Sequence, residues 1–207
     1  MNRLARCVLA GLFAVNANVA HSALQFTDWT SNTATSAAGT VGAITVSLSG
    51  PVQSAVLNGI SPFFSSAALF TPALASSDYI EILVSPPSKT FTLTFSQAVT
   101  DPLMHVNSLA SVFTFAGINP VKVSGNTHFA VSGNTVTGDN AQGQSNGTLR
   151  LPGTFTSISF SGSYVGNDGI LIQVGFDPLL AVPEPHMAAL WMVGLAGVAF
   201  AARRRRR

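Results

Sequence analysis

The sequence has one cysteine, Cys7, and very few charged residues. Cys7 lies in the N-terminal segment that is predicted to be removed, so the folded part of the chain has no thiol. This excludes a disulfide-stabilised domain, a cysteine nucleophile and a cysteine metal site. Charged side chains make up 9% of the chain, against roughly a quarter in typical soluble domains. A low charge together with abundant Ser, Thr, Gly and Asn is typical of a secreted β-protein.

The few charges are unevenly distributed along the chain. Residues 24–182 contain three basic and seven acidic side chains, a net charge of −4, although the whole chain carries a formal charge of +2. The basic excess lies in Arg3, Arg6 and an arginine run at the C-terminus. These charges predict that both ends face membranes, and they disfavour nucleic-acid binding.

Residues 1–23 are predicted to be a secretory signal peptide, which signal peptidase removes. Arg3 and Arg6 form a positively charged start, and residues 7–15 (CVLAGLFAV) form an apolar stretch of suitable length. Small residues follow. A cut between Ser22 and Leu24 is favoured, although Ala17 also offers a cleavage site. A buried N-terminal helix is the competing interpretation.

The C-terminus has three parts in a fixed order. Pro183, Glu184 and Pro185 come first, an apolar run at 186–202 follows, and the chain ends with Arg203, Arg204, Arg205, Arg206 and Arg207. As a helix, the apolar run reaches about 25 Å, close to the roughly 30 Å of a hydrocarbon core. The arginines hold this end in the cytoplasm, so residues 24–181 are expected on the periplasmic side.

This order of Pro183, Glu184 and Pro185, a short transmembrane helix and an arginine cluster resembles the PEP-CTERM sorting signal of Gram-negative bacteria. The resemblance implies recognition by an exosortase, a membrane-embedded cysteine transpeptidase-like enzyme that removes the tail at or near the motif. It also implies an association with exopolysaccharide and biofilm. The protein is then anchored in the inner membrane before processing, and is afterwards at the cell surface or extracellular. A permanent anchor, with Pro-Glu-Pro as a stiff spacer, is the competing interpretation.

Residues 24–181 are predicted to form a single antiparallel β-sandwich, jelly-roll-like in architecture. Short β-rich runs alternate with turn residues every 8–12 positions, and no amphipathic helix is evident. In residues 90–95, Phe91, Leu93 and Phe95 lie on one face and threonines on the other. Residues 155–161 nearly repeat this pattern, with an offset that predicts a β-bulge. The expected strands are 41–48, 52–57, 79–84, 90–99, 103–106, 111–115, 121–124, 129–132, 148–151, 155–161 and 170–176.

Three connections have recognisable turn chemistry. The sequence VSGNT occurs at 123–127 and again at 131–135, and each Gly-Asn pair predicts a hairpin turn. Residues 151–154 (LPGT) resemble the start of a different sorting signal. Phe155 replaces its final glycine and strand-like sequence follows, so a turn is predicted there. Residues 138–147 are predicted to form a polar surface loop.

No pattern of catalytic residues stands out in the middle of the chain. His105 and His128 are its only histidines, and neither has metal-site spacing. His105 lies in an apolar run, which predicts a hydrogen-bonded core or edge residue. No Ser, His and Asp set has a recognisable local signature, and the acids are too scattered to nominate a glycosidase pair. We therefore expect no enzyme activity and no cofactor.

Calcium binding is the sharpest alternative for the loops. Asp139 and Asn140 share one loop, and Asn167, Asp168 and Gly169 share another. Hard oxygen ligands of this kind suit Ca²⁺, but the alternating acidic spacing of known calcium loops is missing. Tight turns use the same residues without any metal.

Three functions from different classes follow. A non-catalytic surface or matrix protein is favoured over a carbohydrate-binding module, with or without calcium, that recognises exopolysaccharide. An enzyme acting on polysaccharide is the least favoured. Sugar rings stack on exposed aromatic side chains, so Trp29, Tyr79 and Tyr164 would support carbohydrate binding only if they are exposed. Core or edge packing is the alternative for each of them.

Overall fold

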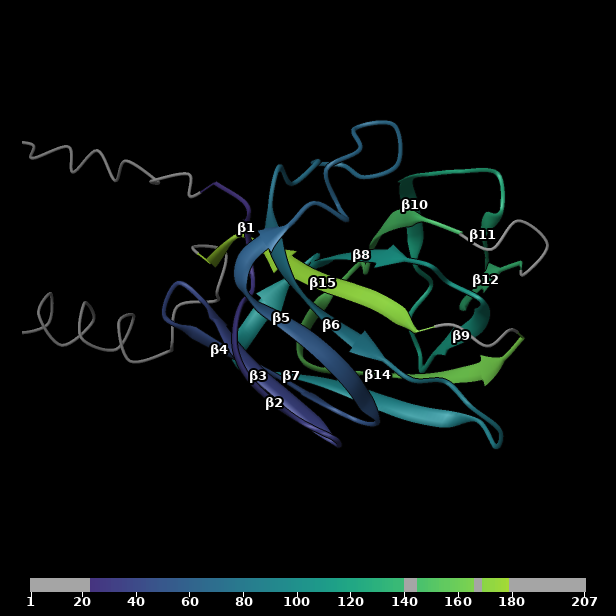
Figure 1. The fold of residues 1–207 in the computed structure, drawn as a ribbon, viewed down its shortest axis with the longest axis horizontal. Coiled ribbons are helices and arrows are strands. Elements are labelled where there is room, and N and C mark those ends of the chain that lie inside the picture. Colours follow the sequence, from purple (N-terminus) through teal and green to yellow (C-terminus); the bar gives the residue numbers. More distant parts are fainter. Residues whose placement is uncertain (1–22, 140–144, 166–168, 179–207) are drawn as a thin grey trace, which may run out of the picture.

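The computed structural model describes residues 23–139, 145–165 and 169–178. Over these residues the protein is an all-β sandwich of two antiparallel sheets (Figure 1), which confirms the predicted fold class. The predicted sorting signal and nearly all of the predicted signal peptide lie outside the described residues.

One sheet has seven strands in the order β10-β13-β8-β15-β6-β5, with β1 paired to β15. Its strands are β1 (Gln25–Phe26), β5 (Val52–Ser61), β6 (Ser77–Ile82), β8 (Leu103–Asn107), β10 (Val121–Gly125), β13 (Gly147–Arg150) and β15 (Ile170–Phe176). In the pairing of β1 with β15, Gln25 lies opposite Phe176. The two ends of the sandwich therefore lie side by side.

The other sheet has eight strands in the order β11-β12-β9-β14-β7-β4-β3-β2. Its strands are β2 (Asp28–Thr33), β3 (Ser36–Val41), β4 (Ile44–Ser49), β7 (Lys89–Thr100), β9 (Ser111–Phe115), β11 (Phe129–Ser132), β12 (Thr135–Gly138) and β14 (Thr154–Tyr164). From β6 onward the chain passes to the opposite sheet at every connection except the one between β11 and β12. The two sheets are thus tied together by most of their connections.

The core between the sheets follows from the period-two pattern of the sequence. On β7, Phe91, Leu93 and Phe95 are buried while the threonines between them are exposed or half-buried. The Phe160 ring on β14 stacks on Phe91, with ring centroids 5.2 Å apart, and also contacts two rings of β9. Burying a side chain of this size contributes about 1.5–3 kcal/mol. This aromatic cluster therefore anchors the centre of the eight-stranded sheet.

The predicted bulge is confirmed on β14. The pairing of β14 with β7 shifts in register between Phe155 and Ser157. The extra residue lets Phe155 and Ile158, three positions apart, both turn toward the core, where Phe155 is partly buried and Ile158 is buried. The sequence offset was thus a real structural signal.

Four strands were not predicted, namely β1, β2, β3 and β12. Strand β3 has the sequence SAAGTV and β2 has DWTSNT. Small and polar residues give little hydrophobic alternation, so the period-two pattern is weak even though the backbone pairs fully. The expected strand at 41–48 is also divided, because a turn with Gly42 at φ 56° separates β3 from β4.

One of the two predicted Gly-Asn hairpins is wrong. The second is a hairpin: Ser132 lies opposite Thr135, and Gly133 has φ 56°. At the first, β10 pairs with β13 while β11 pairs with β12, so the turn carries the chain from one sheet to the other. Gly125 is required there because a Cβ would lie 2.5 Å from the Asn146 carbonyl oxygen. The Gly-Asn motif thus predicts a turn, but it does not predict which strands pair with the strands on either side of that turn.

The predicted surface loop at 138–147 needs a correction at its C-terminal end. Ser145 and Asn146 are buried. The Asp139 backbone N–H donates to Ser145 Oγ at 3.0 Å, and the Ser108 N–H donates to Asn146 Oδ1 at 2.8 Å. These bonds place polar side chains in the interior because each one satisfies a backbone group. By contrast, the turn predicted at 151–154 is confirmed between β13 and β14.

Candidate functional site

The three aromatic side chains considered for sugar stacking do not form a platform. Trp29 is fully buried, and its Nε1–H donates to Gln173 Oε1 at 2.9 Å. Tyr79 is half-buried, with its ring edge-on to Phe63. Only Tyr164 is exposed, at the end of β14. The aromatic arrangement that would favour a carbohydrate-binding module is therefore absent from the described part of the chain.

His105 is a buried structural residue, as predicted. Its Nδ1 lies 2.9 Å from the Thr148 hydroxyl and its Nε2 lies 2.9 Å from the Pro72 carbonyl oxygen. The carbonyl can only accept, so Nε2 carries the proton and Nδ1 accepts from Thr148. Burial lowers the pKa of His105 to about 4, although the Pro72 carbonyl opposes this shift. Three rings surround the imidazole: Phe26, Phe64 and Phe70.

The calcium interpretation gains no ligand set from the described residues. Asp139 Oδ2 lies within hydrogen-bond distance, 2.5 Å, of His128 Nδ1, and both side chains are partly exposed. Asn140, Asn167 and Asp168 lie outside the described residues. Within residues 23–139, 145–165 and 169–178, no three His, Cys, Asp or Glu side chains are grouped closely enough to hold a metal ion.

Two carboxyl groups that are distant in sequence do meet, at Asp28 and Asp78. Asp78 is buried and accepts hydrogen bonds from the backbone N–H groups of Trp29 and Gly59. Burial raises the pKa of Asp78, the two backbone hydrogen bonds oppose this shift, and a hydrogen bond and charge from Asp28 add to it. The carboxylate of Asp78 thus joins β2 to β5. This is the arrangement of a structural carboxylate, because its acceptor sites are taken up by backbone donors.

The outer surface of the eight-stranded sheet carries a different kind of arrangement, an array of hydroxyl groups. Along the regularly alternating stretches of its six central strands (β3, β4, β9, β12, residues 90–96 of β7 and 157–163 of β14), every outward position is Ser or Thr except Ala38 and Val112, and all are exposed or half-buried. We call these residues the hydroxyl face. They are Ser36, Ala38, Thr40, Thr45, Ser47, Ser49, Thr90, Thr92, Thr94, Ser96, Val112, Thr114, Thr135, Thr137, Ser157, Ser159, Ser161 and Ser163.

The strand register aligns these hydroxyl groups in rows. Ser161 lies opposite Thr90 on one side and Thr114 on the other. A second row runs through Ser159, Thr92, Ser49 and Ser36. Neighbouring strands are about 4.8 Å apart, and alternate residues along a strand are about 6.8 Å apart. The hydroxyl face is therefore a regular, uncharged grid.

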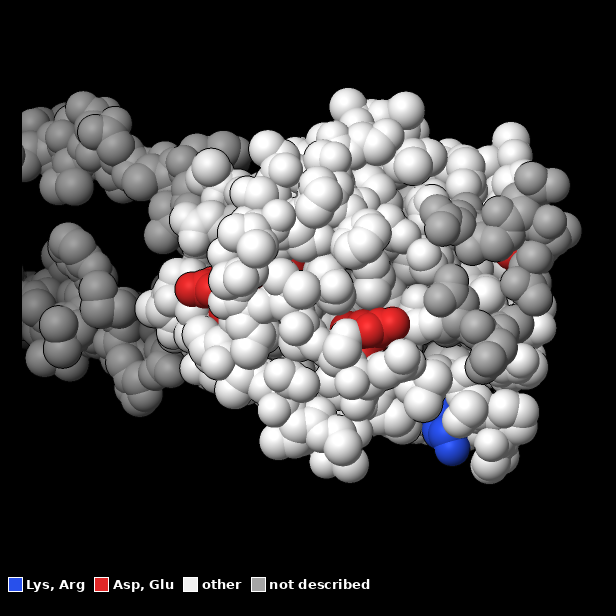
Figure 2. Space-filling model, viewed as in Figure 1, with Lys and Arg blue, Asp and Glu red and all other residues white. Residues whose placement is uncertain are grey.

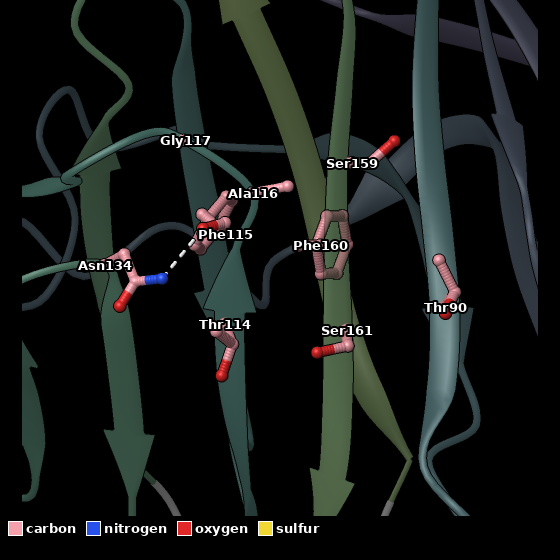
Figure 3. A pocket seen from close by; sticks show the side chains of 9 residues that line it. All are labelled: Thr90, Thr114, Phe115, Ala116, Gly117, Asn134, Ser159, Phe160 and Ser161. Carbon is pink, nitrogen blue, oxygen red and sulfur yellow. Dashed lines mark hydrogen bonds between the residues drawn. The ribbon is translucent and has the colours of Figure 1, made fainter.

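A shallow pocket of about 270 Å³ opens on this face over β9, β14 and β7 (Figure 3). Its lining is Thr90, Thr114, Phe115, Ala116, Gly117, Asn134, Ser159, Phe160 and Ser161. Asn134 Nδ2 donates to the Phe115 carbonyl at 3.1 Å and so fixes one wall. The sequence alone shows that Ser or Thr occupies alternate positions in 90–96 and 157–163, which predicts a polar face on each of these two strands. Which strands lie side by side could not be inferred from it.

The comparisons with known proteins bear on the C-terminal segment. Residues 181–207 match the family model of the PEP-CTERM protein-sorting motif. The C-terminus is a PEP-CTERM sorting motif. This motif implies an exported protein that is sorted by an exosortase. No curated protein and no solved structure matches the chain.

The PEP-CTERM match covers all the sorting residues predicted from the sequence. Pro183, Glu184, Pro185 and the run Arg203–Arg207 fall inside the matched range, but outside the described residues. The predicted transmembrane helix at 186–202 lies outside them as well. Among the residues that the structure describes, no helix is long and apolar enough to span a bilayer.

Proposed function

We propose that this chain is an exported, exosortase-processed protein of the cell surface or extracellular matrix, which works there without catalysis and in association with exopolysaccharide and biofilm. The observation that carries the proposal is the PEP-CTERM motif at 181–207. It directly follows a β-sandwich whose last described residue is Pro178. Cargo domain and sorting signal are thus adjacent but separate in sequence.

The physics of the tail supports this route. Five guanidinium groups behind an apolar run resist transfer across the bilayer, so they hold the C-terminus in the cytoplasm. Pro183 and Pro185 favour an extended backbone in the residues before them, and a processing enzyme can bind a peptide in that form. Glu184 supplies the single negative charge of the tail. Exosortase cleavage at or near these residues then releases the sandwich from the inner membrane.

A non-catalytic role is supported by what the ionisable groups do. His105 is buried and neutral, and Asp78 is held by backbone donors. His128 and Asp139 pair with each other at the surface. Figure 2 shows that acidic and basic side chains are sparse and far apart on the face in view. Such a surface suits contact with matrix polymers better than acid–base chemistry.

Mass spectrometry of the protein from its native envelope tests the proposal. With the host exosortase present, we expect a mature mass lacking both residues 1–23 and the tail beyond the motif. Glu184→Ala, or deletion of the arginine run, is expected to leave the tail in place. Asp177→Ala removes an acidic group just outside the matched range and is expected to be processed normally. An unchanged mature mass in the Glu184→Ala variant, or in a host lacking exosortase, refutes the assignment.

A further inference from the structure

The hydroxyl face is a regular feature of the surface that the proposed function leaves unused. Its rows cross six strands and contain no charged side chain, in a segment whose net charge is −4. Aliphatic side chains are rare on it, so it is not a typical protein-docking surface, whose centre is apolar. The chemistry that such a grid offers is hydrogen bonding to a neutral partner.

Several of its hydroxyl groups are free to bind a ligand. Thr92 Oγ1 and Ser159 Oγ hydrogen-bond to each other at 3.0 Å. By contrast, the hydroxyls of Thr90, Thr114 and Ser161 have no hydrogen-bond partner among the described residues. These three form one row across β7, β14 and β9, and all three line the pocket. Each offers one donor and two acceptor lone pairs.

We infer that the hydroxyl face binds an extended, uncharged polysaccharide, with one sugar unit seated in the pocket. The inference rests on the proposed function, which brings the sandwich into contact with matrix polymers. Sugar hydroxyls donate and accept as Ser and Thr do, and threonine methyl groups pack against sugar C–H groups. A pocket of about 270 Å³ lies near the lower end of small-ligand sites, roughly 300–1,000 Å³. That size suits one ring.

The charge of the protein indicates which class of polysaccharide the hydroxyl face can bind. A polymer of uronic acids or sulfated sugars would meet an acidic segment and a face without Lys or Arg. Acidic groups of such a polymer find no cationic partner there and would lose hydration on binding. A neutral polysaccharide has no charged groups that would lose hydration on binding. Because the hydroxyl face has no positive charge, it is expected to bind neutral polysaccharides in preference to anionic ones.

Affinity electrophoresis of the full chain in detergent tests this assignment. The gels contain dextran or galactomannan, which are uncharged, or alginate, which is anionic. We expect retardation by at least one neutral polymer and none by alginate. Ser161→Arg places a long charged side chain across the pocket and is expected to weaken binding at least tenfold. Gln53→Arg adds the same side chain on exposed β5 of the other sheet and is expected to change binding less than twofold.

Thr114→Val separates hydroxyl loss from steric blocking, because valine has nearly the same shape. We expect it to weaken binding about threefold to tenfold while the fold, checked by circular dichroism, stays intact. Binding to none of the neutral polymers, equal binding to alginate, or equal losses in Ser161→Arg and Gln53→Arg would overturn the inference. Sedimentation that shows dimers broken by Ser161→Arg would assign the face to a second copy of this chain instead.

These outcomes are distinguishable from those for the proposed function. A chain that exosortase processes normally but that binds no neutral polymer refutes only the hydroxyl-face assignment. A chain that binds dextran or galactomannan but keeps its tail in the native host refutes only the sorting proposal.

Discussion

Acidification is expected to destabilise the sandwich through His105. The folded-state pKa is about 4, whereas an unfolded histidine titrates near 6.5. Between these values the unfolded chain binds a proton that the folded protein excludes, so stability falls as pH falls. Each unit of difference corresponds to about 1.4 kcal/mol. The cost therefore reaches about 3 kcal/mol at pH 4 and is absent above pH 7.

The structural reason is that the imidazole has no room for a second proton. Nδ1 accepts from Thr148, which would have to turn its hydroxyl around, and the surrounding rings cannot solvate a charge. Asp78 acts in the opposite direction. Its raised pKa favours the folded state when it is protonated, so acidification stabilises the protein at that site. A comparison with a variant that lacks only His105 is needed to separate the two.

Urea unfolding at several pH values, followed by tryptophan fluorescence, provides the measurement. In His105→Gln, the amide can donate to the Pro72 carbonyl and accept from Thr148 without titrating. We expect the difference in free energy of unfolding between the wild type and this variant to shrink by about 3 kcal/mol from pH 7 to pH 4. NMR titration of the His105 ring should give a midpoint near 4 in the wild type. Parallel pH profiles for the two proteins, or a midpoint near 6.5, would refute the reasoning.

Two further predictions concern the core. Phe160→Ala removes the ring that contacts Phe91 and two rings of β9, and we expect a loss of about 3–5 kcal/mol in urea unfolding. Gly138→Ala would place a Cβ 1.7 Å from the Leu109 carbonyl oxygen. We expect it to lower stability by about 3 kcal/mol or to prevent folding, as judged by melting temperature. Thr94→Ala, on the exposed surface of β7, is the matched control and should cost under about 0.5 kcal/mol. Core variants no less stable than this control would contradict the packing described.

Some strands could be predicted from sequence because their pattern is local. Strand β7 alternates Phe or Leu with Thr, and β15 is an apolar run interrupted only by Gln173 and Gly175, so both were found with nearly correct bounds. Strands β2 and β3 are rich in Ser, Ala, Thr and Gly. Their stability comes from pairing with neighbours in the sheet, and single-strand patterns do not contain that information. The same limit explains the wrong partner assigned to the turn after β10.

The PEP-CTERM motif and the hydroxyl face also differ in how far the sequence alone predicts them. The PEP-CTERM motif was predicted from sequence because its information is the linear order of three short segments. The hydroxyl face was not, because it depends on β9, β14 and β7 lying side by side, although β7 and β9 are separated along the chain by a strand of the other sheet. Its outward threonines and serines were visible only as the polar half of amphipathic strands. The pairing of neighbouring strands aligns these side chains in the rows of the hydroxyl face.

The pairing of β1 with β15 has a consequence for the geometry of sorting. Gln25 lies opposite Phe176, so the start of β1 and the end of β15 lie at the same end of the sandwich. Only residues 179–182 separate the last described residue from Pro183, and four extended residues reach at most about 14 Å. In the proposed topology, with residues 186–202 in the inner membrane, a tether of this length would hold the folded body close to the bilayer before cleavage. In that topology an exosortase would act on a peptide bond close to the folded body.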